Sequence, residues 1–210
     1  MRITSAKFIK SLTKDYAEFN SDLPEVALVG KSNVGKSSLI NMLTNQNKLA
    51  KVSKTPGKTK LVNYFLLNGN FYLVDLPGYG FANVSKEELG QWDARMGGYF
   101  EQSPMLKVVL ILIDIRREPT EHDIAMIEYA NYFGIPYIVM ATKADKVAKS
   151  KRKNECNRIK RLLKDYHCET VLHISSEDKL GKDELLENGA DIIIEKPCQL
   201  LDCINAQKEV

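Results

Sequence analysis

The stretch that most constrains this chain runs from residue 26 to residue 44 and reads VALVGKSNVGKSSLINMLT. Its first four residues are apolar, as in a buried strand, and the part that begins at Ser38 has the apolar spacing of a helix. Between them lies the pattern G-x-x-x-x-G-K-S, from Gly30 to Ser37. In a strand–loop–helix context this pattern holds phosphates, because loop N–H groups and the helix N-terminus point at the anion. We therefore predict that the chain binds a nucleoside triphosphate; the alternative is a strand–turn–helix that matches by chance.

Each part of this loop has an expected task. Gly30 and Gly35 let the backbone bend so that consecutive N–H groups point inward. Lys36 can reach the β- and γ-phosphates, and the Ser37 hydroxyl can ligate Mg²⁺. The predicted phosphate-binding residues are Gly30, Lys31, Ser32, Asn33, Val34, Gly35, Lys36, Ser37 and Ser38.

Beyond the loop, apolar strands alternate with helical segments. The runs at 108–113 and 137–141 are typical of strands covered on both faces, and 61–75 predicts a hairpin around Asn68-Gly69-Asn70. Helices are expected from Ser85, at 119–133 and at about 147–165, with a last strand at 171–174. This order predicts an α/β fold: a mostly parallel six-stranded sheet with one antiparallel edge strand and helices on both faces.

Length and composition favour one globular domain. The 210 residues suffice for a single α/β domain, and a net charge of +3 does not by itself indicate nucleic acid. The four cysteines form no C-x-x-C pair, no apolar run approaches membrane length, and the N-terminus lacks a signal-peptide core. We expect a cytoplasmic monomer with an N-terminal extension at 1–24, a nucleotide-binding domain at 25–187, and an atypical C-terminal segment at 188–210.

Polar clusters follow four of the expected strands. They are Gly30–Ser37, Asp75–Gly78, Thr142–Asp145 and Ser175–Ser176. In an open α/β sheet, ligands bind at the carboxyl ends of the strands. Asp75 can hold Mg²⁺ directly or through water, and the Gly78 N–H can meet the γ-phosphate.

Residues 142–145, with the sequence TKAD, predict the base. A guanine edge offers two adjacent donors that suit a bidentate carboxylate, whereas adenine lacks the 2-amino group, so Asp145 selects GTP over ATP. Lys143 can lay its alkyl stem along the ring. Thr142 stands where guanine-binding proteins more often carry asparagine, and it can bridge loops through its hydroxyl. A solvated charge pair at a strand end is the alternative interpretation.

The order GKSNVGKSS, TPGKTK, DLPGYGFA, TKAD and SSEDK resembles the translation-factor-like P-loop GTPases. More narrowly, Asp75–Ala82 and Asp114–Asp123 resemble the EngB (YihA/YsxC) family of ribosome-biogenesis GTP-binding proteins. The resemblance covers about residues 5–187. It implies a G domain that acts as a GTPase in assembly of the large ribosomal subunit, with a link to normal cell division and septation.

The resemblance also implies residue roles. Thr59 becomes the switch threonine that completes the magnesium shell with Ser37 and Asp75; Thr55 is the runner-up, and an ordinary loop hydroxyl is the alternative for both. The expected catalytic residues are Lys36, Thr59, Gly78 and Asn33. The nucleotide site is expected to include, besides the phosphate loop, Gly57, Lys58, Thr59, Asp75, Leu76, Pro77, Gly78, Thr142, Lys143, Ala144, Asp145, Ser175, Ser176 and Glu177.

Hydrolysis is expected to be slow. Tyr79 stands where Ras-like GTPases place the glutamine that orients water, and a structural role suits this aromatic residue better. In similar GTPases an asparagine at the position of Asn33 helps to bind K⁺; the alternative is that Asn33 merely tolerates the loop backbone. Arg116 and Arg117 could act as an internal arginine finger, but pairing with Asp123 or solvation is favoured.

Residues 143–164 carry ten basic and two acidic side chains. A charge run is usually a solvated helix face, but the family resemblance favours rRNA as its partner. Two functions stay open: a slow molecular switch that docks on a pre-ribosomal particle, and a metabolic or transport-type NTPase. Turnover separates them, because a metabolic enzyme should run near 10 s⁻¹ unassisted.

Overall fold

The computed structural model describes residues 2–13, 16, 22–51, 61–80, 86–168 and 170–187, without the side chains of 86–89, 91 and 93. The expected site residues Gly57, Lys58 and Thr59, the runner-up Thr55, and the C-terminal segment 188–210 lie outside this description.

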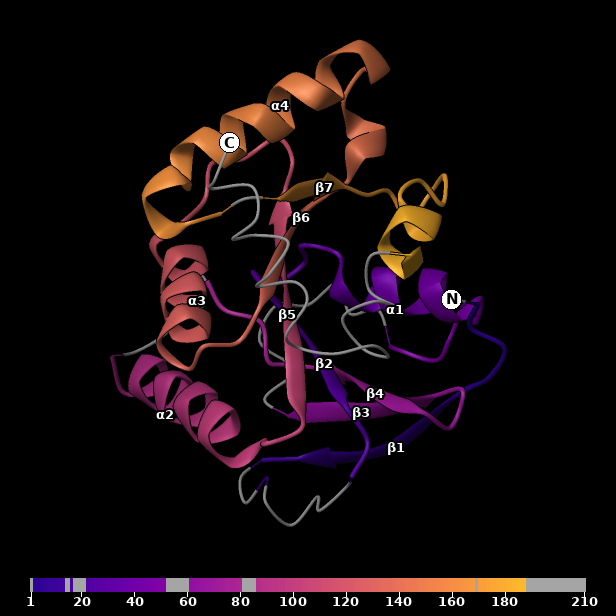
Figure 1. Cartoon of the computed structure of the whole chain (residues 1–210), viewed down its shortest axis with the longest axis vertical. Helices are drawn as coiled ribbons and strands as arrows, with labels where there is room; N and C mark the ends of the chain where they lie inside the picture. The colour runs from indigo at the N-terminus through magenta and orange to yellow at the C-terminus, as the bar shows by residue number, and fades with distance from the viewer. Residues whose placement is uncertain are drawn as a thin grey trace, which may run out of the picture.

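One seven-stranded sheet forms the centre of the described chain, in the order β1-β3-β4-β2-β5-β6-β7 (Figure 1). Strands β2, β4, β5, β6 and β7 run parallel, and β3 is antiparallel to both of its neighbours. The strands are β1 (Ala6–Leu12), β2 (Glu25–Gly30), β3 (Val62–Leu67), β4 (Phe71–Asp75), β5 (Leu106–Asp114), β6 (Tyr137–Thr142) and β7 (Val171–His173).

The sheet has one strand more than the six predicted. The added strand is β1, which pairs with β3 along its length, from Ala6 opposite Leu67 to Leu12 opposite Val62. The antiparallel strand β3 is therefore internal, and β1 forms the edge. Without β1, the outer N–H and C=O groups of β3 would be an open edge. The aromatic rings of Phe8 and Phe65, 5.7 Å apart, hold the two strands together on one face.

Helices cover both faces of the sheet, as predicted. Neighbouring strand residues point to opposite sides, so Ala27 and Val29 join one core while Val26 and Leu28 join the other. The first core is closed by α2 (Lys86–Gln102), α3 (Glu121–Tyr132) and α4 (Lys149–Leu162). The second is closed by α1 (Lys36–Thr44) and by the helical residues 182–187.

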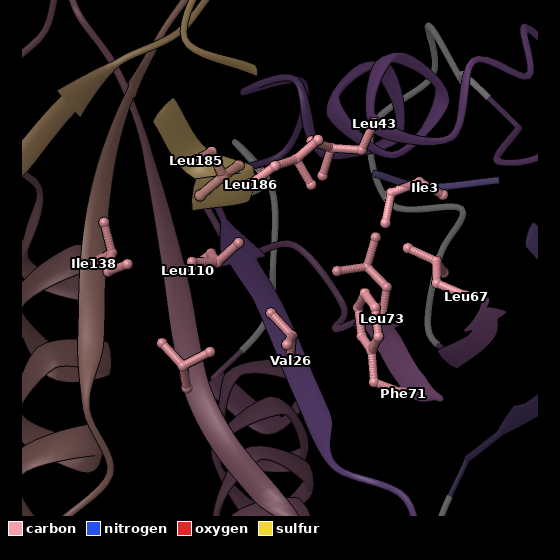
Figure 2. A pocket seen from close by; sticks show the side chains of 11 residues that line it. Ile3, Val26, Leu43, Leu67, Phe71, Leu73, Leu110, Ile138, Leu185 and Leu186 are labelled. Carbon is pink, nitrogen blue, oxygen red and sulfur yellow. The ribbon is translucent and has the colours of Figure 1, made fainter. Parts of the chain in front are cut away.

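The second core contains a small apolar cavity of about 30 Å³ (Figure 2). Leu43 of α1, Leu185 and Leu186 close it from the helical side, and Ile3 reaches it from the N-terminal residues. Leu110 of β5 is among the side chains that form its floor. A cavity of this size without polar lining stays dry, so we regard it as a packing defect of the core.

The helices begin and end close to their predicted positions. α3 starts at Glu121, because Thr120 caps it in a capping box with Asp123. The basic helix predicted at 147–165 is divided into α4 and a 3₁₀ turn, Lys164–Tyr166. In the part of the chain that the structure describes, no helix is long and apolar enough to cross a membrane.

Candidate nucleotide-binding site

The phosphate loop turns sharply between β2 and α1. A Cβ added to Gly30 would lie 2.6 Å from the Leu112 carbonyl oxygen, so the close approach of β5 requires glycine there. Asn33 and Gly35 have positive φ angles, 61° and 121°. The side chain of Asn33 is exposed, and asparagine tolerates this left-handed conformation better than most residues do. The structure thus agrees with the backbone role weighed for Asn33, and a role in K⁺ binding stays a prediction.

The start of α1 presents its N–H groups to the loop. Its N-cap is Gly35, which offers no capping side chain, and its first turn contains no acidic residue. The first helical N–H groups, at Lys36, Ser37 and Ser38, therefore favour an anion such as a phosphate. The N–H of Ser32 instead donates to the Tyr79 carbonyl oxygen at 2.9 Å, which ties the loop to the segment after β4.

Lys36 and Gly78 meet in front of the loop. The Lys36 ammonium lies 3.5 Å from the Gly30 carbonyl oxygen. A Cβ added to Gly78 would come within 3.0 Å of the Lys36 Nζ atom and 3.2 Å of the Ser32 Oγ atom. A larger residue here would therefore require the neighbouring atoms to shift by a few tenths of an ångström. Burial lowers the pKa of Lys36, and the negative charge of Asp75 partly offsets that shift.

Asp75 fits the expected Mg²⁺. Its carboxyl group lies at the end of β4 and is 6% exposed. Among the described residues its Oδ1 atom has no hydrogen-bond partner. Burial raises the pKa of Asp75 against the effects of Lys36 and of a hydrogen bond from Asn63. A magnesium ion or one of its waters would satisfy Oδ1 and keep the carboxylate charged. The second expected ligand, Ser37, is half-buried in the first turn of α1.

Asp145 is held as a carboxylate after β6. Its Oδ1 atom lies 3.1 Å from the Ser175 hydroxyl and its Oδ2 atom 2.9 Å from the Lys146 ammonium. Burial pushes the pKa of Asp145 up, but these two groups outweigh it and leave the pKa below its usual value. The backbone turns at Lys143 with a φ of 58°, and the Ala144 N–H donates to the Ile174 carbonyl oxygen at 3.1 Å. An ionised acceptor in a fixed position is what recognition of a guanine edge requires.

The structure brings the base loop and the phosphate loop together through Thr142. Its buried hydroxyl donates to the Val34 carbonyl oxygen at 2.8 Å, across 108 residues of sequence. The bridging role expected of this hydroxyl is thus observed.

Asp114, at the end of β5, is a residue that sequence reasoning missed. Its Oδ2 atom lies 3.1 Å from the Lys143 ammonium, and Arg116 pairs with the same carboxylate at 2.7 Å. Burial opposes ionisation, but Arg116 and Lys143 hold the pKa of Asp114 well below its usual range. The available signal was its place at the carboxyl edge of the sheet, beside β6.

The predicted pairing of Arg116 with Asp123 is wrong, because Arg116 pairs with another carboxylate. Arg116 instead donates two hydrogen bonds to Asp114, two residues before it, at 2.9 and 2.7 Å. Asp123 instead accepts hydrogen bonds from the Tyr79 hydroxyl and from Thr120. The carbonyl of Arg117 accepts a hydrogen bond from Arg158 at 3.3 Å.

Tyr79 has a structural position. Its side chain is 2% exposed and donates its hydroxyl hydrogen to Asp123. The ring stacks on His122, with centroids 5.7 Å apart, and meets Trp92 edge-on at 5.4 Å. Trp92 in turn donates its indole N–H to the Pro77 carbonyl oxygen at 3.1 Å. A hydroxyl bound in this way cannot orient a water molecule for attack.

The remaining expected residues lie around these groups. Leu76 and Pro77 are buried behind Gly78, and the Leu76 N–H donates to the Leu28 carbonyl oxygen at 3.0 Å. Ser176 is half-buried and Glu177 is exposed in the turn that follows Ser175. Lys31 is exposed at the start of the phosphate loop. Apart from residues 57–59, all expected site residues are thus at the carboxyl edge of the sheet.

The order of these loops along the sheet is that of a P-loop GTPase. A family model described as "50S ribosome-binding GTPase" matches residues 25–143. A Clostridium perfringens protein named "Probable GTP-binding protein EngB" is 47% identical over 199 residues, which cover 93% of this chain and all of the relative.

Two solved structures are similar to this one. The crystal structure of a probable GTP-binding protein engB has a TM-score of 0.66 at 23% identity, and the match covers 82% of this chain and 100% of that one. Era, solved in complex with MgGDPNP and nucleotides of 16S ribosomal RNA, has a TM-score of 0.64 at 23% identity, covering 84% of this chain and 59% of Era. At these identities the structures show the shared fold. The chain belongs to the EngB family of GTP-binding proteins. It is a GTPase, with GTP as its substrate and GDP as its product.

Proposed function

We propose that this protein is a slow GTPase switch in assembly of the large ribosomal subunit, and that its GTP form docks on ribosomal RNA. The family resemblance also suggests a link to cell division and septation, and we propose a cytoplasmic monomer. Mg²⁺ would be held by Asp75, Ser37 and Thr59, and it would neutralise charge on the β- and γ-phosphates. Lys36 and the N–H groups of the phosphate loop would bind the same phosphates, with the Gly78 N–H at the γ-phosphate.

The observation that carries this proposal is the charge on α4 and the turn after it. Of the ten basic residues at 143–164, four have internal ion pairs: Lys143, Lys146, Arg152 and Arg158. The other six are exposed and have no ion pair within the described residues: Lys149, Lys151, Lys153, Lys160, Arg161 and Lys164. Lys149, Lys153 and Lys160 follow one another at four and seven residues, so they share one face of the helix. A helix face of this kind suits a phosphate backbone.

Sedimentation with ribosomal subunits tests the proposal. The protein should sediment with large subunits or their precursors in the presence of a non-hydrolysable GTP analogue, and less with GDP. The double variant Lys149→Glu/Lys160→Glu should lose this binding while it still binds GDP. The matched control is Lys7→Glu/Lys48→Glu, which makes the same charge change on two exposed residues elsewhere. Equal sedimentation of both double variants, or no sedimentation of the wild type with either nucleotide, would contradict the docking role.

The slow rate is supported by the position of Tyr79, whose hydroxyl is bound to Asp123. Without a group that orients water, we expect unassisted turnover on the order of 10⁻⁴ to 10⁻³ s⁻¹. The competing function, a metabolic or transport-type NTPase, predicts about 10 s⁻¹ for the protein alone. A single-turnover measurement of phosphate release without ribosomes separates the two.

A further inference from the structure

Helices α2 and α3 lie side by side on one face of the sheet (Figure 1), and a surface groove of about 640 Å³ lies between them. Each helix contributes residues at spacings of three and four, so each lines the groove with one face. The α2–α3 groove is lined by Ala94, Gly97, Gly98 and Glu101 of α2, by Ala125, Glu128, Tyr129 and Tyr132 of α3, and by Phe133, which follows α3. The nucleotide site described above uses none of these residues.

Two adjacent glycines form part of the α2 wall. Glycine destabilises a helix interior, so two adjacent glycines inside α2 need a structural or functional explanation. A Cβ added to Gly97 would meet no heavy atom within 4 Å, and one added to Gly98 would meet its nearest neighbours at 3.9 Å. Packing among the described residues therefore does not require glycine at either position. Their effect is to expose the α2 backbone to whatever enters the groove.

The α3 wall presents aromatic surface to solvent. Tyr132, in the last turn of α3, is 84% exposed. Phe133 stacks on Phe100 with centroids 5.6 Å apart, and Tyr132 meets the Phe133 ring edge-on at 5.1 Å. An exposed aromatic side chain beside a groove is typical of a protein contact site.

The groove is acidic. Glu101 and Glu128 come from opposite walls, are exposed, and have no ion pair within the described part of the chain. Two carboxylates at one groove repel a phosphate backbone, so RNA does not fit there. A guanidinium group fits well, because it bonds a carboxylate through two N–H groups and stacks on an aromatic ring.

We propose that the α2–α3 groove docks an arginine-bearing segment of another protein. The arginine binds between Glu101 and Glu128, and an apolar neighbour lies over Gly97 and against Tyr132. The volume of the groove suits a few side chains rather than a whole domain. The proposal goes beyond the ribosomal role and does not depend on it, because it is tested on the isolated protein.

The test is a titration followed by amide chemical shifts. The probe is a short synthetic peptide of leucine and arginine, added to the GDP-bound, ¹⁵N-labelled full chain. The reference peptide has citrulline in place of arginine, which keeps the shape and removes the charge. Shifts should be confined to residues 94–101 and 125–133, and the citrulline peptide should bind about fivefold or more weakly.

Matched variants make the test specific. Glu128→Gln should weaken the peptide about fivefold, and Gly97→Leu should block it, since leucine fills the groove and favours the helix. The controls Glu121→Gln and Gly90→Leu make the same changes on the same helices outside the groove lining, and a Cβ at Gly90 has open space. They should bind like the wild type.

Several results would overturn the proposal. One is the absence of shifts at low-millimolar peptide, and another is shifts that map to α4 instead. Undiminished binding by Gly97→Leu would have the same meaning, as would an RNA oligonucleotide that shifts the groove residues. A dimer that dissociates on dilution and is abolished by Gly97→Leu would assign the groove to a second copy of this chain.

Discussion

At the scale of single residues, Asp145 determines which base the site accepts. The change Asp145→Asn replaces the acceptor for the guanine 2-amino group with an amide that can donate to a 2-oxo group. Loss of a charged hydrogen-bond partner should weaken GTP and GDP binding by about 2–5 kcal/mol. Preference should move toward xanthine nucleotides, as measured by competition titration. Asp165→Asn, which alters an exposed carboxylate outside the site, is the control. Unchanged guanine selectivity would refute the assignment.

Potassium tests the second role weighed for Asn33. If its side chain helps to seat a cation near the β/γ bridge, replacing Na⁺ with K⁺ at constant ionic strength should raise the rate of GTP hydrolysis. Bulk screening cannot cause this difference, because both ions carry the same charge. Asn33→Gly should abolish the stimulation and leave GDP binding nearly intact. Glycine is the suitable replacement because the φ angle there is 61°. Identical wild-type rates in the two salts would leave Asn33 with its backbone role.

At the scale of elements, the Tyr79–Asp123 hydrogen bond joins α3 to the segment after β4. Tyr79→Phe keeps the ring between His122 and Trp92 but removes a partner from a buried carboxylate. The free energy of unfolding should fall by about 1.5–3 kcal/mol, measured by urea denaturation. Tyr132→Phe removes a hydroxyl from a side chain that is 84% exposed and should change it by less than about 0.5 kcal/mol. Equal effects of the two changes would show that the buried bond contributes nothing.

The elements differ in how well the sequence predicts them. Strands with unbroken apolar runs, such as β5 and β6, were located to within about two residues, as is usual for strong patterns. The pattern of β1 fits either a strand or an amphipathic segment, because Lys7 and Lys10 interrupt its apolar residues. Its register also shifts between Phe8 and Lys10, so no simple alternation runs through it.

The nucleotide site likewise has parts that the sequence predicts well and parts that it predicts poorly. The phosphate loop and Asp145 were predictable because their chemistry is carried by a few residues at a set spacing. The contacts that position them were only partly predictable. The hydroxyl of Thr142 was expected to bridge loops, but its acceptor, Val34, lies 108 positions away. Asp114 holds Lys143 across neighbouring strands. The order of the strands in the sheet determines which residues become such partners, and no local sequence pattern encodes that order.

At the scale of the whole molecule, one buried carboxyl group should make stability depend on pH. Glu25 is 3% exposed at the start of β2 and accepts a hydrogen bond from Tyr99 at 2.7 Å. Burial raises its pKa to about 7, against 4.5 for a free side chain. Between these values the folded protein holds a proton that the unfolded chain releases, so stability falls as pH rises. The loss should total about 3 kcal/mol and be complete above pH 7.

The variant Glu25→Gln isolates this effect. Glutamine can still accept the hydrogen bond from Tyr99 but does not titrate. The difference in the free energy of unfolding between wild type and variant should therefore shift by about 3 kcal/mol between pH 4.5 and pH 8. Titration of all other groups cancels in this difference. A difference that stays constant over the range would mean that Glu25 ionises normally in the folded protein.

The sheet order also determines when the nascent chain gains each ability during translation. β1 is made first, but it cannot pair until β3 has been made. Ser11 of β1 lies opposite Asn63 of β3, which follows it by 52 positions. β2 has both neighbours, β4 and β5, once residue 114 has left the exit tunnel. The Ser175 hydroxyl that steadies Asp145 arrives 30 residues after it. A growing chain can therefore build the sheet around its phosphate loop before it completes the support of the residue that selects guanine.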